Sequence, residues 1–255
     1  MIERPTVFIL GAGASCDYNF PSGRELIFKI AEGARKRYTG QVVRGETTWM
    51  GVDIAEVIKC AEELVASGLP SVDLFLENRP EYQQIGKALI ARELISCENP
   101  LQFRRGKKLK WLEYLYSHMS SKRDTFTRNQ IAFITFNYDR SVEHFFFTAL
   151  KSSFNLADDE LWAMLAHIPI VHVHGQLGSF GPQEGARAFT TDANESAIRT
   201  AASGIKVVHE NGTDLSPEYK KAHQLLSQAE IVCFLGFGYQ EDNVRRLRAG
   251  TIKVV

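Results

Sequence analysis

The stretch VFILGAGASCDYNFPSGREL, residues 7–26, runs from apolar residues directly into a turn of small residues. Residues 6–10, TVFIL, are apolar and β-branched, as expected of a strand buried on both faces of a parallel sheet. The turn Gly11–Ala12–Gly13, with Ser15 two residues on, can present backbone amides and a helix N-terminus to a phosphate. We expect side chains to be excluded there by an approaching dinucleotide pyrophosphate; a tight turn with no ligand is the alternative. The G-x-G-x-x-G fingerprint is not met, because Cys16 takes the place of the third glycine.

The remainder of the chain alternates strands and helices around a helical middle. Ser22 caps a helix over residues 22–38, with Glu25 three positions on. Further strands are predicted at 130–139, 168–175, 204–210, 230–238 and 251–255, and helices at 52–68, 71–96, 109–120, 140–151, 216–229 and from 241. This alternation predicts an α/β fold with a Rossmann-like, doubly wound parallel sheet. We expect one domain over residues 1–255, with an α-helical insertion at about 40–128.

Composition and charge narrow the class of protein. Thirty basic residues balance thirty acidic ones, so no net field favours nucleic acid or a membrane surface. The basic run RRGKKLKW, residues 104–111, is interpreted as a solvated loop and helix start rather than a nucleic-acid contact. We expect no leader peptide, and no apolar run approaches the ~20 residues of a membrane span. The four scattered cysteines form no C-x-x-C pair, which predicts reduced thiols and a cytoplasmic location.

Four segments follow predicted strands and therefore meet at one edge of the sheet. They are residues 11–15, TFNYD at 135–139, HG at 174–175 and GFGYQEDN at 236–243. In doubly wound sheets, ligands bind outside the carboxyl ends of the strands. The sequence therefore predicts a ligand site built from these four loops.

These segments also resemble the motifs of a known family. GAGASCDYNFPSGR resembles the sirtuin segment GAGIS...GIPDFR, with the same spacing from Gly11 through Pro21 to Arg24. TFNYD resembles the sirtuin TQNID, His174-Gly175 the catalytic histidine motif, and GFGYQEDN the glycine loop at the adenosine end. The similarity is greater to bacterial sirtuin-like, NAD-consuming proteins of antiphage defence, and SVDLFLE at 71–77 is similar to that branch as well. The motifs occur in family order over nearly the whole chain.

The sequence departs from sirtuin deacylases at three places. Residues 176–232 contain no cysteine, so the two zinc-binding cysteine pairs of the deacylases are absent. Asn19 stands where sirtuins have glycine, and asparagine tolerates a left-handed backbone. Ser22 and Gly23 replace an Asp-Phe pair whose aromatic ring shields the reactive sugar. These differences weaken a prediction of deacylation more than one of NAD cleavage.

The resemblance implies cleavage of the bond between nicotinamide and ribose, with Asn137 and His174 as catalytic residues. The Asn137 amide can bind a ribose hydroxyl or the attacking water, and His174, with a reference pKa of ~6.5, can accept a proton. The alternatives are a strand-end turn residue for Asn137 and a core histidine for His174. His172 is interpreted as a core or supporting residue. A His-x-His metal pair finds no third ligand of suitable spacing, so no metal is expected.

The expected nucleotide-binding residues each have a structural alternative. Ser15 binds phosphate or ribose, or caps a helix; Arg24 lies near the nicotinamide ribose, or is a surface residue. Asp139 orients Asn137 or an NAD hydroxyl, or caps the next helix, and Asp242 accepts from a ribose hydroxyl, or is an N-cap. The full set expected to bind NAD is Gly11, Ala12, Gly13, Ser15, Arg24, Asp139, Gly236, Gly238 and Asp242.

We therefore expect an NAD⁺ glycohydrolase, with NAD as substrate, that acts in antiphage defence by NAD depletion. The alternatives are a non-catalytic module that senses NAD or ADP-ribose, and an NAD-dependent protein deacylase or ADP-ribosyltransferase. The defence branch implies a homo-oligomer and a partner protein as trigger or effector, or the helical insertion acting as a lid. Neither nucleic acid nor a membrane is an expected partner.

Overall fold

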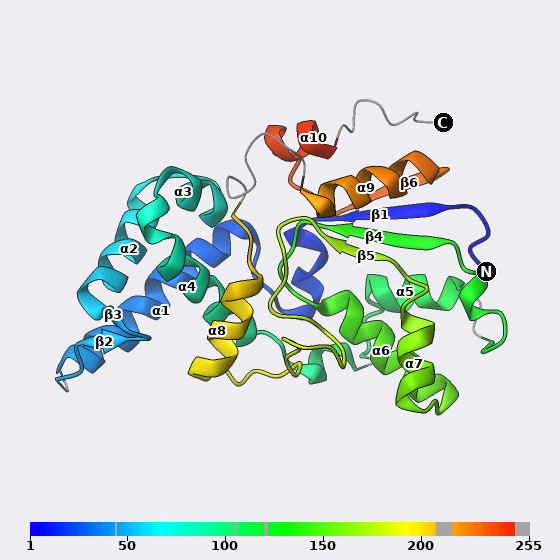
Figure 1. Ribbon diagram of the computed structural model, residues 1–255, viewed down its shortest axis with the longest axis horizontal. Coiled ribbons are helices and arrows are strands. Elements are labelled where there is room, and N and C mark those ends of the chain that lie inside the picture. Colours follow the sequence, from blue (N-terminus) through cyan, green and yellow to red (C-terminus); the bar gives the residue numbers. More distant parts are fainter. Residues whose placement is uncertain (44, 105, 120–121, 208–215, 248–255) are drawn as a thin grey trace. The chain divides into compact units, whose positions relative to one another are not determined.

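The computed structural model describes the chain except residues 44, 105, 120–121, 208–215 and 248–255 (Figure 1). The chain forms two compact units. The sheet unit consists of Met1–Tyr18, Pro100–Val173 and Asn211–Val255, and the helical unit of Asn19–Asn99 and His174–Glu210. The strand predicted at 251–255 lies outside the described residues.

The described part of the sheet unit contains a four-stranded parallel sheet. Its strands are β1 (Thr6–Leu10), β4 (Ile131–Thr135), β5 (Ile170–His172) and β6 (Ile231–Leu235), in the order β5-β4-β1-β6. Leu10 pairs with both Thr135 and Leu235, so three strands end at the same level. The predicted α/β fold with a parallel sheet is confirmed, and so is the common edge at which the loops after β1, β4 and β6 begin.

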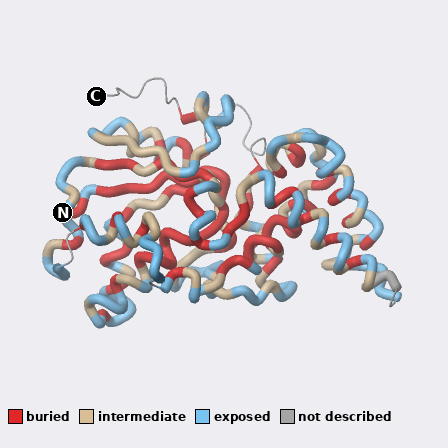
Figure 2. Tube along the Cα trace, turned by 180° about the vertical axis from the view of Figure 1, so that it is seen from behind, coloured by how far each residue is buried: buried red, intermediate tan, exposed pale blue. Residues whose placement is uncertain are grey.

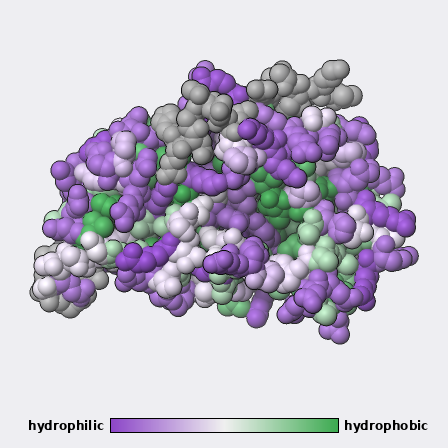
Figure 3. All heavy atoms as spheres, in the orientation of Figure 1, coloured by the Kyte–Doolittle hydropathy of each residue, from purple (hydrophilic) through white to green (hydrophobic). Residues whose placement is uncertain are grey.

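Helices cover both faces of this sheet. Successive strand residues point to opposite sides, so each strand contributes side chains to a core on either face. On one face, Val7, Ile9 and Ile134 pack in a core with Tyr219 of α9 (Pro217–Gln228) and Leu247 of α10 (Glu241–Leu247). Strands β1, β4 and β5 are largely buried and β6 is partly buried (Figure 2), and Figure 3 shows hydrophilic atoms over the outer side of α9. One side of α9 therefore serves the core and the other faces solvent.

Aromatic rings fill the core on the opposite face of the sheet. Phe133 stacks on Phe8 with ring centroids 5.4 Å apart and also contacts Trp111 of α5 (Trp111–His118) and Phe146 of α6 (Ser141–Phe154). The next helix is α7 (Asp158–Leu165), which the sequence patterns did not predict. The two covered faces establish the doubly wound arrangement.

The helical unit contains α1 (Gly23–Val43), α2 (Ile54–Ala66), α3 (Val72–Asn78), α4 (Gln83–Ile95) and α8 (Glu195–Gly204), with a short hairpin of β2 (Thr48–Trp49) and β3 (Val52–Asp53). Ser22 caps α1 as predicted, since its hydroxyl accepts from Glu25 N at 3.3 Å and Glu25 accepts from Ser22 N at 2.8 Å. Asn19 adopts a φ of +69°, the left-handed conformation expected of it. The helix predicted over 71–96 is interrupted at Pro80, which begins a 3₁₀ turn because it has no N–H to donate.

The boundaries of the helical unit differ from those of the insertion predicted at about 40–128. Residues from Pro100 belong to the sheet unit, where Trp111 donates to Ala14 O at 2.7 Å and Tyr18 stacks on Phe103. Conversely, α1 belongs to the helical unit and pairs through Arg37 with Glu93 of α4. The strand predicted at 204–210 is reduced to a bridge between Gly175 and Ile205 in its described part. None of the described helices is long and apolar enough to span a bilayer.

Candidate functional site

The glycine turn after β1 packs directly against the backbone that follows β6. Gly11 N donates to Leu235 O at 3.0 Å, and Gly13 N donates to Gly236 O at 3.1 Å. A Cβ on Gly11 would lie 2.5 Å from Gly236 O, and one on Gly236, whose φ is +58°, would lie 2.0 Å from Ala14 N. Side chains are therefore excluded by backbone packing within the protein. This packing is sufficient to explain the small residues of the turn, so they do not by themselves indicate a pyrophosphate.

The amides of this turn are also largely used within the protein. Besides those of Gly11 and Gly13, the amides of Ala14 and Ser15 donate to Gly11 O and Ala12 O at 2.9 and 3.0 Å. Residues Ala12–Ala14 of this segment form a 3₁₀ turn. The first α-helix, α1, starts only at Gly23 and belongs to the helical unit. The phosphate site expected from amides and a helix N-terminus in this turn is thus not formed by these four amides.

Asn137, two residues after β4, is held firmly at the same edge of the sheet. Its side-chain Nδ2 donates to Gly11 O at 2.9 Å and to Ser15 Oγ at 3.0 Å, and its backbone N donates to Thr135 Oγ1 at 3.0 Å. A main-chain carbonyl can only accept, so the Gly11 contact fixes which end of the amide carries the nitrogen. Both hydrogens of Nδ2 are used, and the group that Asn137 has left to offer is the acceptor Oδ1.

Ser15 and Asp139 form a buried support for this amide. Ser15 Oγ accepts from Asn137 and donates to Asp139 Oδ2 at 2.7 Å, while Asp139 Oδ1 accepts from Ser141 N at 3.1 Å at the start of α6. Asp139 therefore supports Asn137 through Ser15 and also accepts from the first amide of α6, although the N-cap position itself is Arg140. Burial raises the pKa of Asp139 above its usual value, although the hydrogen bonds from Ser141 and Ser15 and the nearby His172 offset part of this.

His172, the last residue of β5, contacts the same asparagine from the main-chain side. Its Nδ1 lies 2.9 Å from Asn137 O, and its Nε2 lies 2.6 Å from Glu143 Oε1 in the first turn of α6. Burial on its own lowers the pKa of His172, but Glu143, the Asn137 carbonyl and Asp139 together raise that pKa above the usual value. His172 is therefore a buried residue in contact with Asn137, which agrees with its interpretation as a core or supporting residue.

Several buried polar residues here were not singled out from the sequence. Thr135, Arg140, Glu143 and His144 are all buried, and Arg140 has no exposed surface. Burial and the charge of Arg140 lower the pKa of His144 to about 4, and its ring lies edge-on to Phe103. The signal for Glu143 was available in SVEHFFF, where an acidic residue directly precedes a histidine and three aromatic residues.

The other predicted residues divide between the loop after β6 and the helical unit. Asp242 is exposed, lies in the first turn of α10 and pairs with Arg245 at 2.5 Å, so it is not the N-cap. A Cβ on Gly238 would meet nothing within 4 Å. Arg24 is exposed on α1, 6.0 Å from the Phe28 ring centroid, and His174 is buried with its carbonyl accepting from Lys206 N at 2.9 Å. The sheet unit thus brings together the glycine turn, Ser15, Asn137, Asp139 and Gly236, and the helical unit contains Arg24 and His174.

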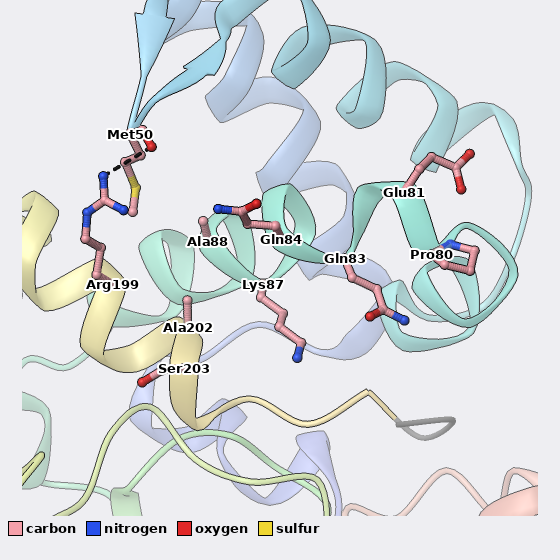
Figure 4. Close-up of a pocket in the computed structure, with 10 residues that line it drawn as sticks. All are labelled: Met50, Pro80, Glu81, Gln83, Gln84, Lys87, Ala88, Arg199, Ala202 and Ser203. Atoms are coloured by element: carbon pink, nitrogen blue, oxygen red, sulfur yellow. Dashed lines mark hydrogen bonds between the residues drawn. The ribbon is translucent and has the colours of Figure 1, made fainter. Parts of the chain in front are cut away.

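The helical unit has a pocket of about 600 Å³, formed by the β2–β3 turn, the start of α4 and α8 (Figure 4). Arg199 donates to Met50 O at 3.1 Å and to Glu195 at 2.6 Å. Figure 4 shows the charged ends of Lys87 and Arg199 pointing away from each other. The pocket therefore presents no convergent cationic site, and none of the residues singled out from the sequence lines it.

In the described ranges, no three His, Cys, Asp or Glu side chains are grouped as a metal site would require. No protein-family model matches the sequence, and a search of curated proteins finds no match either.

Proposed function

We propose that the protein is an NAD⁺ glycohydrolase that cleaves the bond between nicotinamide and ribose. The observation that carries this proposal is the fixed amide of Asn137, whose two N–H groups are occupied and whose Oδ1 is left as an acceptor at the carboxyl edge of the sheet. The resemblance to sirtuin-like NAD-consuming proteins implies NAD⁺ as the substrate and Asn137 and His174 as the two catalytic residues.

For bond cleavage, an oriented hydrogen-bond acceptor near the ribose is more important than a phosphate-binding loop. The nicotinamide–ribose bond breaks through an oxocarbenium-like state, and the bonding electron pair leaves with nicotinamide. Water then adds its oxygen to the anomeric carbon and releases one proton. An amide oxygen held in one place can accept from that water or from a ribose hydroxyl and keep it in line with the carbon. The Ser15–Asp139 support keeps the amide from turning.

His174 takes the released proton in this proposal. An imidazole can act as a general base near neutral pH, and loss of such a group typically lowers the rate by about 10²–10⁴-fold. Arg24, Asp242 and Gly238 remain predicted contacts to the nucleotide. Because four amides of the glycine turn are already used, we expect the pyrophosphate to be bound mainly by other groups.

The biological setting is proposed from the resemblance alone. Depletion of NAD by such an enzyme would serve antiphage defence in the cytoplasm, with a homo-oligomer or a partner protein controlling it. A sensor of NAD or ADP-ribose is the second candidate, since it would need the same binding groups without turnover.

Incubation of the purified protein with NAD⁺, followed by chromatography of nicotinamide and ADP-ribose, tests the proposal. Wild type, Asn137→Ala and His174→Ala are compared over a range of protein concentrations, with the exposed Asn78→Ala as matched control. We expect products from wild type and the control and their loss from the other two. Nucleotide binding without product at every protein concentration would favour the sensor and contradict the hydrolase.

A further inference from the structure

A buried histidine–glutamate pair lies beneath the main chain of Asn137. His172 is 8% exposed and its partner Glu143 is 9% exposed, and they come from different elements, the end of β5 and the first turn of α6. The two residues are 29 positions apart in the sequence, and His172 Nε2 lies 2.6 Å from Glu143 Oε1. Because this contact is short and both side chains are buried, it holds the His172 ring in one orientation.

The partners of the ring determine where its hydrogens are. The Asn137 carbonyl on the Nδ1 side can only accept, so Nδ1 carries a hydrogen and donates at 2.9 Å. On the Nε2 side, the ring lies 2.6 Å from Glu143 Oε1, and this contact holds the ring with Nδ1–H directed at the Asn137 carbonyl.

The backbone of Asn137 is consequently held at both of its polar groups. Thr135 Oγ1 accepts from its N–H, and His172 donates to its C=O. Together with the side-chain contacts to Gly11 and Ser15, these bonds leave the residue no freedom to rotate its peptide planes without breaking a hydrogen bond. A displacement of about 1 Å at a reacting group lowers rates by about 10²-fold.

We propose that His172 and Glu143 are positioning residues that set the orientation of Asn137, an inference that rests on the proposed function for its catalytic consequence. They touch no substrate atom in this account. They act through the hydrogen bond to the Asn137 carbonyl. This bond fixes the backbone of Asn137 and therefore the direction in which its side-chain Oδ1 points. If the pair served only to pack the core, its loss would lower stability and leave the amide in place.

The test compares His172→Phe and His172→Gln with His144→Phe, a buried histidine in the same unit that packs against Phe103. In ¹⁵N-labelled protein, the side-chain amide signal of Asn137 is assigned by its loss in Asn137→Ala. We expect His172→Phe to shift or broaden this signal and to lower kcat about 10²-fold with KM changed less than about twofold. His172→Gln, which keeps a donor, restores part of both.

His144→Phe is expected to lower stability without moving the Asn137 signal or kcat. An unmoved Asn137 signal in His172→Phe would overturn the positioning role, whatever the enzyme assay gives. If wild type cleaves no NAD⁺ but the signal moves, the proposed function fails while the contact between His172 and Asn137 stands. The two failures are therefore distinguishable.

Discussion

Gly236 shows how a residue can look like a ligand-binding position for a reason internal to the protein. Its φ of +58° is in the left-handed region, and the backbone of Gly13 and Ala14 leaves no room for a Cβ. From the sequence, the small residues of the turn could be identified, but the contact that requires them joins positions more than 200 residues apart. Such a contact leaves no local pattern.

Replacement of Gly236 by alanine is expected to lower the free energy of unfolding by about 1–3 kcal/mol or more, because both the conformation and the contact are strained. Gly238→Ala, two residues away and with open space around the added methyl, should change it by less than about 0.5 kcal/mol. Urea titration of the two variants measures the difference. Equal effects would contradict the backbone-packing explanation.

Asn137 and Asp139 could be selected because TFNYD lies at the carboxyl end of a predicted strand and resembles a sirtuin motif, and Ser15 from its place in the glycine turn. Their mutual hydrogen bonds could not be predicted, since Ser15 and Asp139 are 124 residues apart.

Replacing Ser15 by alanine removes the hydrogen bond to Asp139 and one acceptor of Asn137. We expect a loss of about 1–3 kcal/mol in stability and a lower kcat, measured by urea titration and NAD⁺ turnover, with Ser15→Thr retaining more of both.

At the scale of elements, the sheet was predictable and the packing of the helical unit was not. The sequence placed β1 to the residue and α6 and α9 to within a few residues, because apolar strands and capped helices have local signals. It missed α7 and α8, and it joined α3 to α4 across Pro80. The pairing of segments distant in sequence depends on contacts that no single segment encodes.

One such contact is the ion pair of Glu98 and Arg187, which joins the chain after α4 to the loop before α8. Glu98 has no exposed side-chain surface, and the Arg187 side chain is 6% exposed. Arg187 also donates to Leu177 O at 3.2 Å. This pair therefore connects the two sequence segments of the helical unit.

Glu98→Gln is expected to lower the free energy of unfolding by about 3–5 kcal/mol, because it removes the carboxylate charge that faces the buried Arg187 guanidinium. The matched control is Glu195→Gln, which removes the exposed pair with Arg199 and should cost less than about 1 kcal/mol. Thermal or urea unfolding of both variants measures these costs. A loss at Glu98 no greater than at Glu195 would show that the pair does not hold the segments together.

At the scale of the whole molecule, buried titratable groups should make stability depend on pH. The pKa of His172 is raised in the folded protein by Glu143 and Asp139, against the opposing effect of burial. A raised pKa contributes stability that is fully present below the unfolded value of ~6.5 and is lost as the pH rises through the folded value. The raised pKa of Asp139 acts in the same sense, starting from its lower unfolded value.

The difference in unfolding free energy between wild type and His172→Gln is therefore expected to be largest below about pH 6 and to shrink as the pH rises. Urea titrations of both proteins between pH 5 and 9 give this difference directly. A difference that grew with pH would mean that the folded protein holds His172 in its neutral form.

The role of Asn137 is tested by comparing NAD⁺ binding and NAD⁺ turnover in wild type and Asn137→Ala. Calorimetric titration gives the dissociation constants, and chromatography of nicotinamide gives the rates in the same samples. We expect Asn137→Ala to bind NAD⁺ within about tenfold of wild type but to lose turnover by about 10²-fold or more, as expected for a group that orients the reacting water. Turnover that survives the loss of Asn137 would contradict a catalytic role for this residue.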